Sequence, residues 1–153
     1  MLFSKSPDET LNLGTRLGSL LKIGDVVCLY GELGSGKTVF AKGIACSLGI
    51  SERDIASASF VIIGAYSALI HGARAPFYHI DLYRIENPGE VDSIGIEEFI
   101  GGEGVAVIEW AERLGKSPDS ISVRLKILNA DKREITIGGI DDEDWDYKQD
   151  RQA

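Results

Sequence analysis

Apolar and polar residues follow one another along this chain in blocks whose periods predict both helices and strands. In residues 6–24 the leucines recur at spacings that approximate one apolar face of a helix. Ser6, Pro7 and Glu9 supply the N-cap, first-turn and capping-box residues of a helix start, and Gly24 closes the block. We therefore expect a helix at the beginning of the chain.

Strand-like runs and short helical segments make up most of the remaining chain. Residues 25–30 are apolar and β-prone, and the segment from residue 37 to Gly49 can form a helix. Residues 51–59 are small and polar, as in a loop. Further strands are expected at residues 60–66, 76–83, 104–110, 121–128 and 134–138, and short helices at residues 90–94 and 96–100.

The connections between these strands indicate how they pair. The segment between residues 60–66 and 76–83 is too short for a crossover helix, and residues 121–128 and 134–138 are closer still, so we expect two antiparallel hairpins. Residues 104–110 are continuously apolar, which is typical of a strand that is buried on both faces.

A glycine-rich motif lies between the first strand and the second helix. Residues 31–38 read GELGSGKT, a complete G-x-x-x-x-G-K-[ST] phosphate-binding loop in the strand–turn–helix setting that such a loop requires. Its glycines let backbone N–H groups turn toward phosphate oxygens, and the helix N-terminus adds partial positive charge. We expect Lys37 to reach the β- and γ-phosphates and Thr38 to ligate Mg²⁺. The nucleotide contacts expected from the motif are Glu32, Leu33, Gly34, Ser35, Gly36, Lys37 and Thr38.

With this motif, the order of the elements predicts an α/β fold. We expect a single-domain, P-loop NTPase-like mixed sheet, with parallel strands around the phosphate loop, antiparallel hairpins and flanking helices, over residues 1–140. Residues 141–153 hold five Asp and one Glu in a polar sequence and are expected to form an acidic, flexible C-terminal tail.

A nucleotide hydrolase or transferase also needs acidic residues near its phosphate loop. Asp81 and Glu109 each follow an apolar strand directly, and ligands of α/β sheets bind at the carboxyl ends of strands. Lys37, Asp81 and Glu109 are therefore expected to carry the chemistry. Thr38, Glu109 and Asp81 are expected to hold the metal. A surface salt bridge is the alternative role of either acid.

Residues beside these acids admit more than one role. His79 and Tyr83 share a strand face with Asp81 by two-residue periodicity, and we interpret His79 as a structural residue. Arg84 can contact a phosphate or a carboxylate, or it can lie exposed on the surface. Trp110 can be a core residue, an interface anchor or a wall of the nucleotide site.

The charge and the cysteines restrict the function further. The 153 residues include 24 Asp and Glu against 16 Lys and Arg, a net charge of −8, whereas a protein that binds nucleic acid alone usually has a basic face. Independent nucleic-acid binding is therefore not expected.

Cys28 and Cys46 suit packed thiols in a reducing compartment. Without a signal-peptide core or an apolar run as long as a membrane span, a cytoplasmic protein is expected.

Four sequence blocks, in this order, resemble those of the TsaE family (also called YjeE), the bacterial ATPase subunit of the machinery that makes threonylcarbamoyladenosine in tRNA. They are GELGSGKT at residues 31–38, SASF at 57–60, HIDLYR at 79–84 and IEWAE at 108–112, with GIEEF at 95–99 as a looser fifth element. The resemblance spans about the first three quarters of the chain. The phosphate loop is generic, but the H-x-D-L-Y-R and I-E-W-x-E blocks in this order are specific.

This resemblance implies ATP and Mg²⁺ as cofactors, with Thr38 and Glu109 as metal ligands and Asp81 close by. It also implies that Glu9 lies against the nucleotide and that Ser59 contributes to the nucleotide site from a switch segment. Family members act through the protein partners TsaD and TsaB, which make the main tRNA contacts. The chain would then contact tRNA only within that complex and would not associate with a membrane.

The sequence departs from the family pattern in two places. The usual S-P-T-F switch is SASF here, so that Ala58 replaces a proline and Ser59 keeps a hydroxyl, and a more mobile loop is expected. Ala65 stands where the family tends to carry an acid. Both departures bear on hydrolysis and switching more than on nucleotide binding.

Two other functions share a phosphate loop. A nucleotide or small-molecule kinase needs an acceptor pocket and often an arginine-rich lid, but residues 85–104 contain several acids and no Arg or Lys. A nucleotide-binding scaffold that hydrolyses little would act as an interaction module. Phosphate release, measured alone and with partners, separates such a scaffold from an ATPase.

Overall fold

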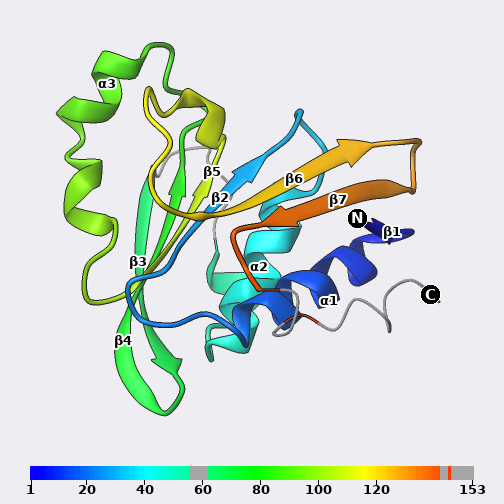
Figure 1. Ribbon diagram of the computed structural model, residues 1–153, viewed down its shortest axis with the longest axis horizontal. Helices are drawn as coiled ribbons and strands as arrows, with labels where there is room; N and C mark the ends of the chain where they lie inside the picture. Colours follow the sequence, from blue (N-terminus) through cyan, green and yellow to red (C-terminus); the bar gives the residue numbers. More distant parts are fainter. Residues whose placement is uncertain (56–61, 142–144, 146–153) are drawn as a thin grey trace.

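A seven-stranded sheet organises the computed structural model, which describes residues 1–55, 62–141 and 145 (Figure 1). The strand order across the sheet is β1-β7-β6-β2-β5-β4-β3. The strands are β1 (Leu2–Ser4), β2 (Val26–Tyr30), β3 (Ile63–Ile70), β4 (Ala73–Asp81), β5 (Val105–Glu109), β6 (Ile121–Ile127) and β7 (Arg133–Gly138). The helices are α1 (Pro7–Gly18), α2 (Lys37–Ser47) and α3 (Pro88–Ser93), with the 3₁₀ helices η1 (Glu52–Asp54), η2 (Ile96–Phe99) and η3 (Ala111–Arg113).

Parallel pairing at the centre of the sheet surrounds the strand that leads into the phosphate loop. β2 pairs in parallel with β5 on one side and with β6 on the other, and β5 also pairs in parallel with β4. This register places Glu109 opposite both Asp81 and Leu29. The hairpins β3–β4 and β6–β7 and the pair β1–β7 are antiparallel. The predicted fold class, a mixed sheet with parallel strands around the phosphate loop, two antiparallel hairpins and flanking helices, is confirmed.

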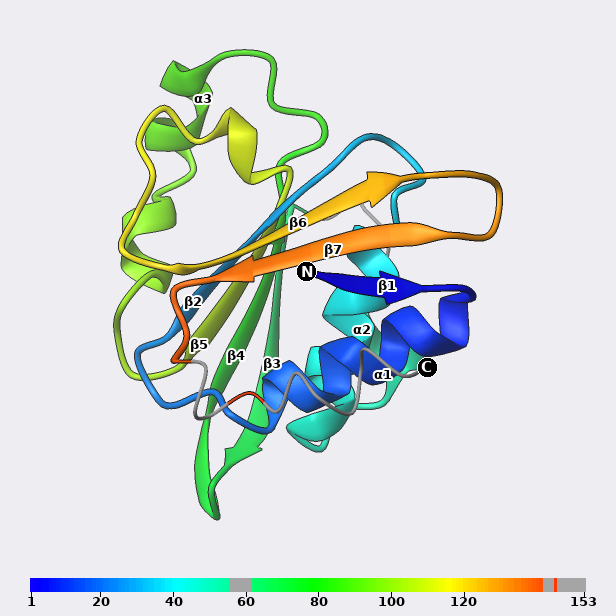
Figure 2. The same cartoon turned by 45° about the vertical axis from the view of Figure 1, so that its right-hand side comes forward.

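Both faces of the sheet are covered, each by different elements. Figures 1 and 2 show α1 and α2 side by side on one face and α3 on the opposite side. Successive residues of β2 enter different cores: Val27 and Leu29 pack with α1 and α2, whereas Val26 and Cys28 pack with the residues of α3, η2 and η3. Burial on both faces explains why β2 and β5 are continuously apolar in sequence.

Two glycines let α1 and α2 approach each other backbone to backbone. A Cβ added at Gly14 would lie 2.2 Å from the carbonyl oxygen of Phe40, and one added at Gly43 would lie 2.1 Å from the carbonyl oxygen of Leu11. The spacing of the leucines in α1 does not predict this contact. The close contact between the two helices fixes the position of α2, and with it the position of Lys37 at the start of that helix.

The first helix starts as expected but is shorter. The Ser6 side chain accepts a hydrogen bond from the Glu9 N–H at 3.1 Å, as in the predicted cap. α1 ends at Gly18 instead of near Gly24, and the chain continues in a tight turn in which the Leu21 N–H donates to the Gly18 carbonyl at 3.2 Å. Leu21 is nevertheless fully buried. Its apolar spacing therefore indicated burial and not helix.

The β3–β4 hairpin is longer than expected. Both strands extend through most of residues 67–75, which the sequence assigns to a connection, and only His71 and Gly72 form the turn. The φ angles of these two residues are 48° and 81°, which is the backbone twist that a two-residue hairpin turn needs. A histidine in that conformation gives little sequence signal, because positive φ is uncommon for residues with a Cβ. The three-residue strand β1 was also not predicted.

Some predictions concern residues outside the described ranges. Residues 56–61 hold the SASF block, and of the predicted tail only Asp141 and Trp145 are described. Trp145 is 2% exposed, and the guanidinium of Arg16 lies 5.0 Å from the centre of its ring. Within the described part of the chain, none of the helices combines the length and the apolar character that crossing a membrane would take.

The contact between α1 and α2 can be tested with one methyl group. We expect Gly43→Ala to lower the free energy of unfolding by roughly 1–3 kcal/mol, because the new Cβ would meet backbone atoms of α1. Urea unfolding measures this change. Gly102→Ala is the control, since a Cβ there meets nothing within 4 Å. Alanine is otherwise the better helix former, so a stabilised Gly43→Ala variant would contradict the close contact.

Candidate functional site

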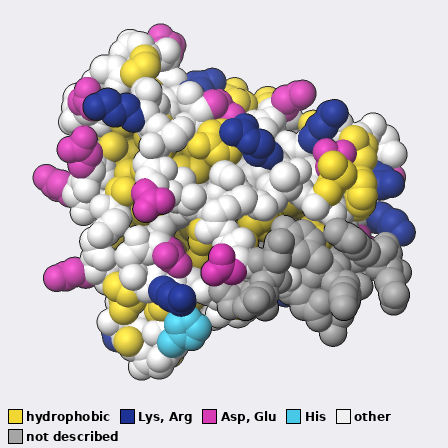
Figure 3. All heavy atoms as spheres, viewed as in Figure 1, with side chains coloured by type: hydrophobic (Ala, Val, Ile, Leu, Met, Phe, Trp, Pro, Cys, Tyr) yellow, Lys and Arg dark blue, Asp and Glu magenta, His cyan; other side chains and the backbone are white. Residues whose placement is uncertain are grey.

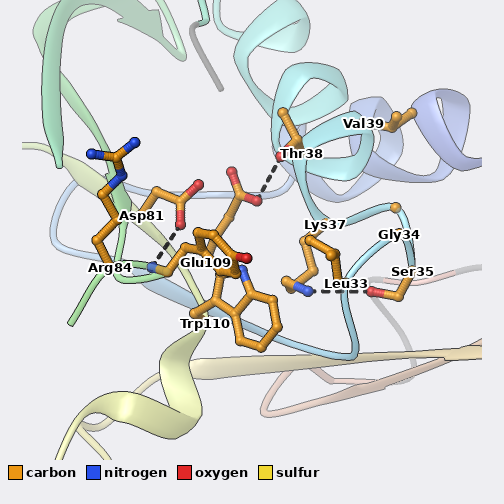
Figure 4. A pocket seen from close by; sticks show the side chains of 12 residues that line it. Leu33, Gly34, Ser35, Lys37, Thr38, Val39, Asp81, Arg84, Glu109 and Trp110 are labelled. Carbon is orange, nitrogen blue, oxygen red and sulfur yellow. Dashed lines mark hydrogen bonds between the residues drawn. The ribbon is translucent and has the colours of Figure 1, made fainter. Parts of the chain in front are cut away.

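A cleft of about 470 Å³ opens where the phosphate loop faces the carboxyl ends of β4 and β5 (Figure 4). Its lining comes from the loop and the start of α2, and from the residues that end or follow the two strands. The lining residues are Leu33, Gly34, Ser35, Gly36, Lys37, Thr38, Val39, Asp81, Tyr83, Arg84, Glu109 and Trp110. Eight of the residues predicted for the site therefore lie together.

The loop has a backbone that only glycine adopts readily. The φ angles of Gly31, Gly34 and Gly36 are 153°, 80° and 101°. Gly36 is the N-cap of α2 and supplies no side-chain acceptor, so the first N–H groups of this helix are left for an anion. The guanidinium of Arg133, in β7, donates to the Gly34 carbonyl at 3.1 Å and ties the loop to the other end of the chain.

Lys37 is held inside the loop that precedes it. Its ammonium donates to the carbonyl oxygens of Gly31 at 2.6 Å and Glu32 at 2.9 Å, and it lies 4.0 Å from the centre of the Trp110 ring. The residue is 5% exposed. Burial lowers the pKa of Lys37, and nearby acids, of which Glu112 has the largest effect, act in the opposite direction.

Thr38 and Glu109 join the start of α2 to the end of β5. The Thr38 hydroxyl donates to Glu109 Oε1 at 2.7 Å, as Figure 4 shows. The other carboxylate oxygen, Oε2, is hydrogen-bonded to His79 Nε2. Glu109 is 1% exposed and His79 is 4% exposed, so this chain of three side chains is buried. Glu109 is thus a partnered carboxylate within the cleft, and the alternative of a surface salt bridge does not apply.

Asp81 lies beside Glu109 because parallel pairing brings the ends of β4 and β5 to the same edge. Its Oδ1 accepts a hydrogen bond from the Tyr83 N–H at 3.0 Å. Burial raises the pKa of Asp81 above its ordinary value of 3.8, and the charge of Glu109 raises it further, whereas the Tyr83 N–H opposes the rise. Two acids close together out of water are costly unless a cation or a proton balances them.

Aromatic residues form the outer wall of the cleft. The rings of Tyr83 and Trp110 lie 5.3 Å apart, and Trp110 has a φ of 56°. The guanidinium of Arg113 lies 4.9 Å from the centre of the Trp110 ring and donates to the carbonyl oxygens of Tyr83 and, at 2.7 Å, Ile85. Of the three roles open to Trp110, the wall of the site matches its position. The sequence reasoning missed Arg113, which no motif marks.

Three residues of the predicted nucleotide site are placed differently or are not described. Glu32 contributes its backbone carbonyl to Lys37 and is not among the described residues that line the cleft. Glu9 does not line it either; its carboxylate accepts from the Lys5 N–H at 2.6 Å. Ser59 lies outside the described residues. Their contacts with a nucleotide stay predictions.

The donors gathered in the cleft are oxygens of the kind that hard cations prefer. In the described ranges no group of three or more His, Cys, Asp or Glu side chains forms a metal cage. Mg²⁺ does not need one, since it is commonly held by one or two protein oxygens together with water and phosphates. The Thr38 hydroxyl and the carboxylates of Glu109 and Asp81 fit that requirement.

Comparison with known proteins relates the chain to one family. The family model for the threonylcarbamoyl adenosine biosynthesis protein TsaE matches residues 4–135. The tRNA threonylcarbamoyladenosine biosynthesis protein TsaE of Treponema pallidum is 41% identical over 136 residues, which cover 88% of this chain and 96% of that protein. The TsaE protein of Bacillus subtilis is 36% identical over 137 residues, covering 88% of this chain and 82% of its own.

A solved structure supports the same relationship. The crystal structure of Bacillus subtilis YdiB aligns with a TM-score of 0.68 at 33% sequence identity. The alignment covers 92% of this chain and 85% of that one. The similarity therefore extends over the sheet and the helices and is not limited to the phosphate loop.

The raised pKa of Asp81 predicts a cost in stability. The folded protein binds a proton on Asp81 more tightly than the unfolded chain does. Protonated Asp81 therefore adds to the free energy of unfolding below the ordinary carboxyl pKa, and this contribution is lost as pH rises through the raised pKa. We expect Asp81→Asn, which stays neutral, to raise the free energy of unfolding by about 1 kcal/mol at about pH 7 and by less at about pH 4. Urea unfolding at both pH values tests this. The exposed Asp131→Asn is the control, and equal changes in the two variants would contradict the assignment.

Proposed function

The chain belongs to the TsaE family of tRNA threonylcarbamoyladenosine biosynthesis proteins, and within that family we propose that it is the Mg²⁺-dependent ATP-binding and ATP-hydrolysing subunit. One observation carries the proposal. The hydroxyl of Thr38, at the start of the helix that follows the phosphate loop, is hydrogen-bonded to Glu109, a buried acid at the end of the neighbouring strand. P-loop nucleotide hydrolases pair a Ser or Thr with an acid in this way to hold their metal.

The loop fits the phosphates of a nucleotide. Its positive-φ glycines keep side chains away from the concave surface, and the uncapped start of α2 directs N–H groups into the cleft. Lys37 is already oriented there by two carbonyl oxygens of its own loop. Anionic phosphate oxygens are better acceptors for an ammonium than neutral carbonyls, so Lys37 gains by exchanging its partners.

Thr38, Glu109 and Asp81 have separate roles in the proposed reaction. Bound Mg²⁺ would supply charge neutralisation on the phosphates. Thr38 and Glu109 would hold the cation. Asp81 would orient a water molecule, or accept a proton from it, through Oδ2, since Oδ1 is bonded to the Tyr83 N–H.

Partner proteins complete the proposed function. We propose TsaD and TsaB as the partners, as membership of the TsaE family implies. We expect tRNA to be bound only within the complex, because the chain is strongly acidic. Acidic side chains gather on the α3 side of the face in Figure 3, where residues 85–104 contain no Lys or Arg. Such a face suits a basic protein surface. Reduced Cys28 and Cys46 suit the cytoplasm as the compartment of this assembly.

Lys37 provides the direct test of nucleotide binding. We expect Lys37→Ala to weaken ATP binding roughly tenfold or more, since a charge-assisted contact to phosphate is lost. Isothermal titration calorimetry measures the affinity. Lys42→Ala, on the same helix but outside the cleft lining, is the matched control and should bind like the parent. Equal ATP affinity of parent and Lys37→Ala would refute the phosphate-loop assignment.

Partner dependence gives a second test. We expect the isolated chain to hydrolyse ATP slowly and the rate to rise when the cognate TsaD–TsaB pair is added, because a partner can supply or order groups that complete the site of a phosphate-loop enzyme. Phosphate release measures the rate. tRNA alone should change it little, and binding to the pair should weaken with salt. Tight tRNA binding by the chain alone, or no response to the pair at micromolar concentrations, would argue against this function.

A further inference from the structure

The carboxylate of Glu109 has each of its two oxygens bonded to a different side chain. Oε1 accepts from the Thr38 hydroxyl and faces the cleft, while Oε2 is bonded to His79 Nε2 on β4. An ionised carboxylate can only accept, so Nε2 of His79 carries the proton of this bond. Both residues are at least 96% buried, at 1% and 4% exposure, so water does not compete for Oε2.

This arrangement limits how Glu109 can bind a cation. With Oε2 engaged by His79, the carboxylate offers one oxygen to the cleft, on the side of Thr38. Rotating the carboxylate to offer both oxygens would leave His79 Nε2 without its acceptor in a buried place, which is costly. His79 therefore keeps Glu109 in a one-oxygen geometry.

We propose that His79 is a positioning residue that sets the cation specificity of the site in favour of Mg²⁺ over Ca²⁺, by restricting Glu109 to ligation through a single oxygen. The inference rests on the proposed nucleotide and metal site, and it adds a residue and a selectivity to it. Mg²⁺ is small, takes six ligands and retains water, so single carboxylate oxygens suit it. Ca²⁺ takes six to eight oxygens and often binds carboxylates through both.

Three variants separate this role from ordinary packing. His79→Leu removes the donor and frees Oε2. His79→Gln keeps an N–H near the position of Nε2. His79→Asn is polar but carries its amide nearer the main chain, so it no longer reaches Glu109. The comparison of Gln with Asn stands even if the Leu variant does not fold, since both are polar and similar in size.

The test measures equilibrium binding of ADP in Mg²⁺ and in Ca²⁺ by calorimetry, so that no turnover is involved. We expect the parent and His79→Gln to bind ADP more tightly with Mg²⁺ than with Ca²⁺. In His79→Asn and His79→Leu that preference should fall roughly tenfold or more, the usual effect of removing a partner of a metal ligand. A merely structural histidine would weaken binding with both cations alike and leave the ratio unchanged.

The result also distinguishes this inference from the function on which it rests. If the parent binds ADP equally well with and without divalent cations, the metal site itself is refuted. If the parent needs a divalent cation and all three variants keep its Mg²⁺-to-Ca²⁺ ratio, the site stands and the role of His79 is overturned.

Discussion

The parallel pairing of β4, β5 and β2 is the constraint on which the site depends. It brings Asp81 and Glu109 side by side and puts Glu109 next to Leu29 of β2, the strand that enters the phosphate loop. β5, nearly all of β2 and the carboxyl end of β4 are buried, so packing on both faces fixes their register. A slip of one residue would turn every side chain to the wrong face. The close contact of α1 with α2 then sets the helix that carries Thr38 against Glu109.

This geometry takes a group of ionisable side chains out of water. Lys37, His79, Asp81 and Glu109 are all 5% exposed or less. Three of them are balanced by short-range partners: Lys37 by carbonyls and an aromatic ring, and His79 and Glu109 by each other. Asp81 has one backbone donor and a neighbouring negative charge, so it is the least satisfied member. Unfavourable burial of a charge is common at sites that bind ligands, where stability is given up for function.

The sequence predicted those parts of the structure that local signals determine. The motif at residues 31–38 fixed the loop, and apolar runs ending in Asp81 and Glu109 located both acids, because strand ends are visible in the hydrophobic pattern. The parts that were missed depend on contacts between distant residues. His79 and Glu109 are 30 positions apart, and so are Arg113 and Tyr83, so their pairing follows from the sheet and not from either segment alone. Two signals pointed to His79: it shares a strand face with Asp81, and it is the first residue of the HIDLYR block.

Two glycines of the phosphate loop have different surroundings, and this limits which residues the chain can carry there. At Gly34 a side chain would have open space, but the φ of 80° has the wrong handedness for most residues. At Gly31 the added Cβ would lie 2.6 Å from the carbonyl oxygen of Leu125 in β6. A side chain at residue 31 would therefore collide with a backbone atom more than ninety positions away in the sequence. No side-chain replacement in β6 removes that atom. A side chain at residue 31 would need β6 to move and would still carry a strained φ of 153°.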